Sequence, residues 1–258
     1  MKILRKRPRL LISLTVAVVA AVTVTVAMII QANKMETLSP REERDRVASG
    51  TGVPSGQVDC RKAECIALTF DGNPGEPTDR LMDLLKQYKA PSTFFLEGRR
   101  IHKYPDVVRR IAKDGHEIGD HTWTHAVLTD VSDAQIRDEL RRTARAISGI
   151  TGSEPTLMRP PQGRTDDRVS KVAKELGMAQ VLWTVTAKDY ETDDSALIIK
   201  RVLDGAGRDG IILLHPLHKG TVPAMPSILQ ALSKQGYTFV TVSQLLAPAK
   251  AEPGKIYR

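Results

Sequence analysis

The chain has 258 residues, of which 26% are charged and 4% are aromatic, and its formal net charge at pH 7 is +8. Five of the 38 basic residues fall within the first nine positions, and the remaining 33 nearly balance the 30 acidic residues. So small a surplus, spread over a domain, excludes the basic stripe of a nucleic-acid-binding protein. The length fits one domain of about 200 residues with a short appendage.

The basic start is followed by an uncharged run at residues 10–30. As an α-helix this run is about 32 Å long, which is enough to cross a bilayer. The apolar part of a cleaved signal peptide is usually shorter, roughly 7 to 15 residues. We therefore expect residues 1–30 to be a transmembrane signal anchor, with a signal peptide cut near Ala27 as the alternative. Both place the domain outside the membrane, because the basic N-terminus stays in the cytoplasm.

Residues 31–58 are polar and show no apolar period, which predicts a flexible linker, with a surface segment packed on the domain as the alternative. The two cysteines of the chain, Cys60 and Cys65, follow directly. In an oxidising compartment we expect a small disulfide loop, with two unpaired thiols as the alternative. Residues 59–248 then form the folded domain, and residues 249–258 are expected to be a polar tail.

From residue 66 onward, short apolar or β-branched runs alternate with helical patterns. Helices are expected between most of the runs, and Ser132 with Gln135 forms a capping box that starts one of them. The alternation predicts a mainly parallel sheet with helices outside it, either open or closed into a barrel. Seven strands are predicted, at residues 66–70, 92–96, 117–119, 156–159, 180–184, 210–214 and 238–242.

Polar residues stand at the C-terminal ends of four predicted strands, where (β/α) barrels collect their active-site groups. Two of these residues, His121 and His125, are four positions apart, so in a helical turn both imidazoles face one side and can share a zinc, cobalt or iron ion. A single aspartate after a strand is more often a turn residue, and a single histidine is more often structural. The coincidence of Asp71, the two histidines, Arg159 and His215 at one edge nevertheless predicts an active site.

The order and spacing of these motifs resemble the polysaccharide deacetylases of carbohydrate esterase family 4, over about residues 60–247. The matching segments are LTFD at 68–71 with Pro74, GHEIG at 115–119 before the histidine pair, RPP at 159–161, Asp189, and LLH at 213–215. The resemblance implies an α/β fold, a distorted (β/α) barrel of about seven parallel strands. It also implies an extracytoplasmic hydrolase that removes N-acetyl groups from peptidoglycan or a chitin-like glycan.

The resemblance further assigns roles in a reaction that uses a metal-activated water. His121 and His125 are the expected ligands of a divalent metal, most often zinc, with cobalt as an alternative. Asp71 is the expected base that takes a proton from water, and Arg159 is the cation that positions it. The expected partners are an N-acetylated cell-wall glycan and, through the N-terminal helix, the membrane.

His215 is the expected acid, since an amide nitrogen leaves readily only when it is protonated. Asp189 is expected to orient or tune this histidine. Four further residues are expected to bind substrate, and these are Pro161, Gln162, Tyr190 and Leu213.

The sequence departs from the family pattern at Gly72, where the family has a second aspartate that serves as the third metal ligand. Glycine has no ligand atom, so Asn73 and Asp120 are the candidates to complete the set. Two neutral imidazoles without an anionic partner hold an ion less tightly. A second hypothesis is therefore a catalytically impaired, deacetylase-like module that binds cell-wall glycan.

Overall fold

The computed structural model describes residues 36–47, 52–53 and 58–258. Its strands form one sheet in the order β6-β7-β1-β2-β3-β4-β5-β9, with β8 beside β1, and every neighbouring pair is parallel. The strands are β1 (Cys65–Asn73), β2 (Thr93–Leu96), β3 (Glu117–Asp120), β4 (Leu157–Met158), β5 (Ala179–Val181), β6 (Val185–Thr186), β7 (Gly210–Leu214), β8 (Thr238–Phe239) and β9 (Ile256–Tyr257).

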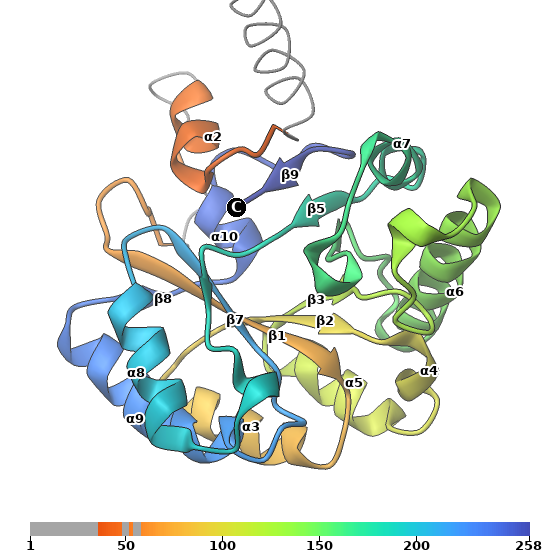
Figure 1. Ribbon diagram of the computed structural model, residues 1–258. Coiled ribbons are helices and arrows are strands. Elements are labelled where there is room, and N and C mark those ends of the chain that lie inside the picture. Colours follow the sequence, from red (N-terminus) through yellow and green to blue (C-terminus); the bar gives the residue numbers. More distant parts are fainter. Residues whose placement is uncertain (1–35, 48–51, 54–57) are drawn as a thin grey trace, which may run out of the picture. The chain divides into compact units, whose positions relative to one another are not determined.

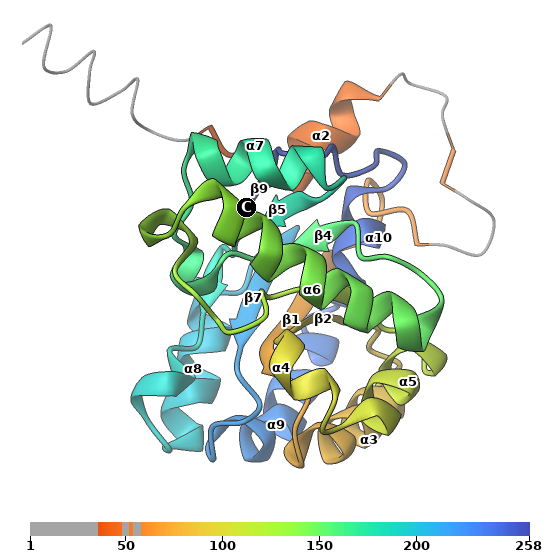
Figure 2. The same ribbon diagram turned by 90° about the vertical axis from the view of Figure 1, so that its right-hand side faces the viewer.

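Helices between the strands cover the outer side of the curved sheet (Figures 1 and 2). They are α2 (Pro40–Arg46), α3 (Pro77–Gln87), α4 (Gly98–Ile101), α5 (Pro105–Lys113), α6 (Asp133–Thr151), α7 (Asp167–Glu175), α8 (Ser195–Gly205), α9 (Thr221–Lys234) and α10 (Val242–Leu246). The sheet runs from β6 at one edge to β9 at the other, so the barrel is incomplete. The predicted α/β class and distorted (β/α) barrel are confirmed.

All seven predicted strands are present, with bounds that differ by a few residues. The helix expected after Ser132 is α6, and both hydrogen bonds of its capping box with Gln135 are formed. The predicted disulfide joins Cys60 and Cys65, whose Cα atoms are 5.5 Å apart. Two short strands, β6 and β9, were not predicted.

The C-terminal segment is part of the sheet. Ile256 and Tyr257 are buried in β9, which pairs with β5. This corrects the expectation of a polar tail at residues 249–258. A strand of two residues shows no sequence period, and its pairing partner lies more than 70 positions earlier in the chain, so only the tertiary fold reveals it.

The described part of the predicted linker packs on the domain. Leu38 pairs with Tyr257, and α2 begins at a capping box formed by Ser39 and Glu42. Arg44 of α2 is buried, and its Nη2 lies 2.7 Å from a carboxylate oxygen of Asp209. These contacts correct the expectation of a flexible linker for residues 37–47.

The predicted membrane-spanning segment, residues 10–30, lies outside the described residues. Within residues 36–47, 52–53 and 58–258, we find no helix with the length and apolar character that crossing a bilayer requires.

Strand β1 shows how the fold aims side chains at the site. Its residues alternate between two faces, as in any strand. Leu68 and Phe70 belong to the apolar layer beneath the helices, whereas Ala67 belongs to the cluster inside the barrel. The same alternation directs Thr69 and Asp71 into the barrel, at the end of the strand where the cavity opens.

Candidate active site

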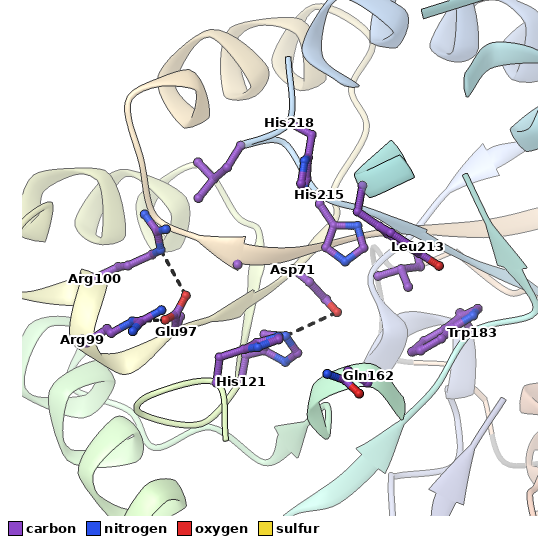
Figure 3. A pocket seen from close by; sticks show the side chains of 14 residues that line it. Asp71, Glu97, Arg99, Arg100, His121, Gln162, Trp183, Leu213, His215 and His218 are labelled. Carbon is purple, nitrogen blue, oxygen red and sulfur yellow. Dashed lines mark hydrogen bonds and ion pairs between the residues drawn. The ribbon is translucent and has the colours of Figure 1, made fainter. Parts of the chain in front are cut away.

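A cavity of about 650 Å³ lies at the C-terminal ends of the strands (Figure 3). Segments far apart in the sequence meet there: β1, the loop that follows β3, and the end of β7. The residues that they contribute to its wall include Asp71, Gly72, His121, His125, Leu213 and His215. The structure thus brings together the predicted acid, the predicted base and both predicted metal ligands.

Asp71 is held by Arg159, which is fully buried. The guanidinium Nη1 donates to Asp71 Oδ1 at 2.7 Å and to Thr69 Oγ1 at 2.8 Å, and the carbonyls of Val181 and Leu182 accept from Nε and Nη2. Every nitrogen of the guanidinium therefore has a protein partner, and the carboxylate is fixed in one orientation.

The carboxylate of Asp71 is ionised at neutral pH. Burial alone would raise its pKa, but the positive charge of Arg159, with smaller contributions from His121 and His215, holds the pKa below its usual value. The second oxygen, Oδ2, lies 3.7 Å from Nε2 of His121. Asp71 can therefore accept a proton within the cavity.

The hydrogen bonds of His121 fix its tautomer. Its Nδ1 lies 2.8 Å from the carbonyl oxygen of Arg159, an acceptor, so Nδ1 carries the proton and Nε2 presents a lone pair. Burial lowers the pKa of His121 to about 4, so the ring is neutral at pH 7. A buried neutral imidazole whose other nitrogen is hydrogen-bonded is the usual form of a metal-ligating histidine.

The rings of His121 and His125 contact each other edge to face, with their centroids 5.0 Å apart. The expectation of a helical turn for this pair is wrong, because residues 121–125 form an irregular loop. Thr122 and His125 both adopt a φ of 63°, in the left-handed region that non-glycine residues rarely enter. Backbone strain of this kind concentrates at functional sites, where the surrounding structure holds it in place.

His215 forms a second charged pair with Asp189. Its Nδ1 donates to Asp189 Oδ1 at 2.8 Å, while Oδ2 accepts from the His215 backbone N–H at 2.6 Å and from the hydroxyl of Thr221 at 2.7 Å. Burial by itself lowers the pKa of His215, but Asp189 and the charge of Asp71 outweigh it and raise the pKa. The ring is thereby poised to donate a proton near neutral pH.

Comparison with known proteins agrees with this geometry. Residues 59–181 match the family described as polysaccharide deacetylase. A peptidoglycan-N-acetylglucosamine deacetylase of Bacillus cereus is 40% identical over 187 residues, which are 70% of this chain and 87% of that protein. The chain belongs to the polysaccharide deacetylase family.

Other family members extend the match. The peptidoglycan-N-acetylglucosamine deacetylase PgdA of Listeria monocytogenes is 36% identical over 206 residues, which are 80% of this chain and 42% of PgdA. The chain thus spans less than half the length of that relative. The solved structure "T48 deacetylase with substrate" superposes with a TM-score of 0.75 at 37% identity and covers 78% of this chain and 100% of its own.

Gly72 occupies a β-bulge, since the register of β1 against β2 shifts between Asp71 and Asn73. Its φ is +76°, and a Cβ placed there would meet no atom within 4 Å beyond its chain neighbours. Glycine is the residue that adopts this conformation without strain. Position 72 of this deacetylase family member therefore opens onto the cavity with room for a side chain.

Neither candidate for the third metal ligand lines the cavity. The side-chain oxygen of Asn73 accepts the hydroxyl of Thr78 at 2.9 Å, which commits it elsewhere. Asp120 immediately precedes His121 and is fully buried, and one of its oxygens accepts the Thr122 backbone N–H. Burial raises the pKa of Asp120 well above its usual value, and its Oδ2 has no hydrogen-bond partner among the described residues.

The donor set fits a divalent ion only in part. His121 and His125 offer two imidazoles, but the described residues contain no group of three or more His, Cys, Asp or Glu side chains placed to hold a metal. Catalytic zinc sites usually have three protein ligands and an open position. Within residues 36–47, 52–53 and 58–258, no third protein ligand joins the two histidines.

Three of the four residues expected to bind substrate line the cavity. Gln162, Tyr190 and Leu213 line the cavity, whereas Pro161 is buried in a short 3-10 helix at Pro161–Gly163 and does not. Tyr190 is 50% exposed and stands edge-on to His215 at 5.4 Å. It presents an aromatic face at the rim of the cavity.

Several cavity residues were missed by the sequence analysis. The ring centroid of Trp183 lies 5.7 Å from the guanidinium carbon of Arg159, and its place near the end of the strand predicted at 180–184 was the available signal. The others are Glu97, Arg99, Arg100 and Leu217; His218, three positions after His215, lines the cavity as well. Charged residues on a helix usually form a solvated face, so nothing in the sequence distinguished the two arginines.

Proposed function

We propose that this domain is an N-deacetylase that hydrolyses N-acetyl groups of amino-sugar polymers of the cell wall. The observation that carries the proposal is the presence of two oriented charged pairs, Asp71 with Arg159 and His215 with Asp189, at one cavity. Support comes from the relatives, which are named as peptidoglycan and chitin deacetylases.

The two pairs match the two proton transfers that amide hydrolysis needs. Asp71 takes a proton from water as its oxygen adds to the acetyl carbonyl carbon. When the C–N bond breaks, His215 donates its proton to the nitrogen, so acetate and a free amino sugar are released. Arg159 and Asp189 position these two groups, which reduces the reorganisation required in the transition state.

We propose that His121 and His125 bind a divalent ion, zinc or cobalt, with water in the remaining positions. When bound, such an ion polarises a carbonyl and lowers the pKa of water. The fixed Nε2 lone pair of His121 supports this proposal. The chain's own contribution is to keep the imidazole of His121 oriented beside Asp71, with the ring of His125 against that of His121.

We further propose that the domain lies outside the cytoplasmic membrane, held by a signal anchor at residues 1–30. The basic start followed by the uncharged run supports this orientation. The disulfide of Cys60 and Cys65 supports an oxidising compartment.

The function is tested by measuring acetate release from N-acetylglucosamine oligomers and from cell-wall glycan, with zinc, cobalt or a chelator. We expect release from at least one glycan that rises with added metal. An absence of acetate with every glycan and every metal would refute the proposal.

A pH profile of kcat tests the two charged pairs. Asp71 must be ionised, so kcat falls on the acid side only as the pH drops through the lowered pKa of Asp71. His215 must be protonated, so kcat falls on the alkaline side as the pH rises through the raised pKa of His215. Asp189→Asn removes the partner that raises the pKa of His215. We expect the alkaline limb of the profile to move to lower pH in this variant, and an unmoved limb would show that His215 is not the acid.

Gly72→Asp tests the metal site. The side chain has room, and aspartate tolerates a positive φ better than most residues, at a cost of about 1 kcal/mol. An added carboxylate beside two imidazoles should lower the Kd for zinc by roughly tenfold or more, equivalent to about 1.4 kcal/mol. Zinc titration by calorimetry measures the change.

Gly72→Asn is the matched control, because asparagine has the same shape and the same backbone strain but no charge. Equal zinc affinity in the Asp and Asn variants would show that position 72 is not beside the ion. His121→Ala, which removes one proposed ligand, should abolish the binding.

A further inference from the structure

Two arginines on the cavity wall, Arg99 and Arg100, have no part in the reaction described above. They lie with Glu97 on one side of the cavity, and His215, Leu213 and Trp183 lie on the other (Figure 3). We propose that Arg99 and Arg100 bind a carboxylate carried by the glycan, so that acidic amino-sugar polymers are preferred to neutral ones. This inference rests on the proposed function, because it specifies which glycan the same cavity accepts.

Glu97 organises the two guanidinium groups. Its carboxylate is 4% exposed, with Oε2 accepting from Arg100 Nε at 3.1 Å and Oε1 paired with Arg99 Nε. One buried carboxylate thus accepts a hydrogen bond from Arg100 and forms an ion pair with Arg99. In the described part of the chain neither pair of terminal Nη groups has a protein partner, and the two side chains remain 56% and 36% exposed.

The charges of the cavity leave a positive surplus on this side. Asp71 and Glu97 are the acidic side chains that line the cavity in the described part of the chain. Arg159 balances Asp71, and Glu97 balances one of the two arginines, so one guanidinium charge remains. A planar carboxylate matches the fork of terminal N–H groups on a guanidinium. A neutral polymer would leave that charge without a partner.

The arginines are fixed relative to the reacting groups. They lie on α4, whose Gly98 N–H donates to the Thr122 carbonyl at 2.9 Å, and the Arg99 N–H donates to the Trp123 carbonyl at 3.0 Å. A Cβ at Gly98 would lie 2.4 Å from Trp123, so α4 packs directly on this loop. Because the loop also carries both histidines, a carboxylate bound here would set which acetamido group reaches Asp71.

The carboxylate can come from two sources on a wall polymer. One is an acidic ether substituent on the sugar, such as the lactyl group of a muramic acid unit. The other is a peptide joined to the lactyl group through an amide bond. That bond removes the lactyl carboxylate, but the peptide carries carboxylates of its own. Both present the same chemistry to Arg99 and Arg100, and ligands that carry one or the other distinguish them.

Binding of three disaccharides tests the inference by calorimetry. They are N-acetylglucosaminyl-N-acetylmuramic acid, its methyl ester, and the same disaccharide carrying a peptide with free carboxylates. We expect the wild type to bind an acidic form roughly tenfold more tightly than the ester, the scale of one charge-assisted hydrogen-bonded pair. Tighter binding of the free acid identifies the lactyl source, and tighter binding of the peptide form alone identifies the peptide.

Variants tie the preference to the two arginines. Arg99→Gln and Arg100→Gln should each weaken binding of the acidic form more than binding of the ester, and so reduce the preference for the acidic form. Arg99→Lys keeps the positive charge but lacks the paired N–H groups of a guanidinium, so it should retain part of the preference for the acidic form. Arg109→Gln on α5 is the matched control, because Arg109 is 59% exposed but lies away from the cavity. It should leave the Kd of all three disaccharides unchanged.

The outcomes separate this inference from the proposed function. Equal affinity of the wild type for the ester and both acidic forms, or an equal loss for all three ligands in the arginine variants, would overturn the inference even if acetate is released. If no glycan releases acetate but the preference exists and disappears in the variants, the carboxylate site stands and the deacetylase proposal fails.

Discussion

Replacing His215 by alanine is expected to lower kcat for acetate release by about 10²- to 10⁴-fold, the usual contribution of a general acid. The ring is oriented by Asp189 at 2.8 Å and lines the cavity, and the hydrogen bond to Asp189 raises its pKa, which favours the protonated form. Because the proton is transferred only as the C–N bond breaks, KM should change little. Steady-state kinetics of acetate release from the preferred glycan measure both constants.

His102→Ala is the matched control for this loss. His102 is an exposed histidine next to α4 that packs edge-on against Trp123 and is not part of the cavity wall. Replacing it should keep kcat within about twofold of the wild-type value, as expected for an exposed position away from the site. Similar kcat values for the two alanine variants would remove His215 from the mechanism.

Asp209→Asn is expected to destabilise the fold by about 3 kcal/mol, because removing one partner of a buried ion pair leaves the other charge uncompensated. Arg44 is 2% exposed and its charge is balanced by Asp209 at 2.7 Å. Asp209 has a φ of +65°, which asparagine tolerates, so the variant isolates the charge. Urea unfolding followed by circular dichroism measures the free energy.

Arg41→Gln is the matched control, since Arg41 pairs with the same carboxylate at 3.0 Å but is 55% exposed. Arg41→Gln should lower the free energy of unfolding by less than about 1 kcal/mol. The double variant Arg44→Met with Asp209→Asn removes both buried charges and should recover much of the stability lost in the single variant. If the double variant is as unstable as Asp209→Asn, the buried pair does not explain the loss.

The strand ends that carry the chemistry were predictable from the sequence. A parallel strand buried on both faces shows as a continuous apolar run, and a polar residue that ends such a run, like Asp71 or His215, stands at the edge where barrels place their sites. The spacing of His121 and His125 indicated a shared ligand, although a strained loop rather than a helix brings them together.

The features that were not predictable depend on tertiary contacts. Strand β9 and helix α2 are short, and what holds them is pairing and burial against segments distant in sequence, such as Arg44 against Asp209. Arg99 and Arg100, with their local pairs to Glu97, resemble an ordinary charged helix face, and only the fold places them on the cavity wall. Such contacts leave no period in the sequence.

Mass spectrometry of an N-acetylated glycan before and after incubation with the protein and zinc tests the central claim most directly. The wild type should remove acetyl groups from the sugars and leave free amines, while Asp71→Asn, which keeps the shape of the side chain but not the base, should leave the polymer intact. A glycan that the wild type does not alter, or that Asp71→Asn deacetylates at the wild-type rate, would contradict the account.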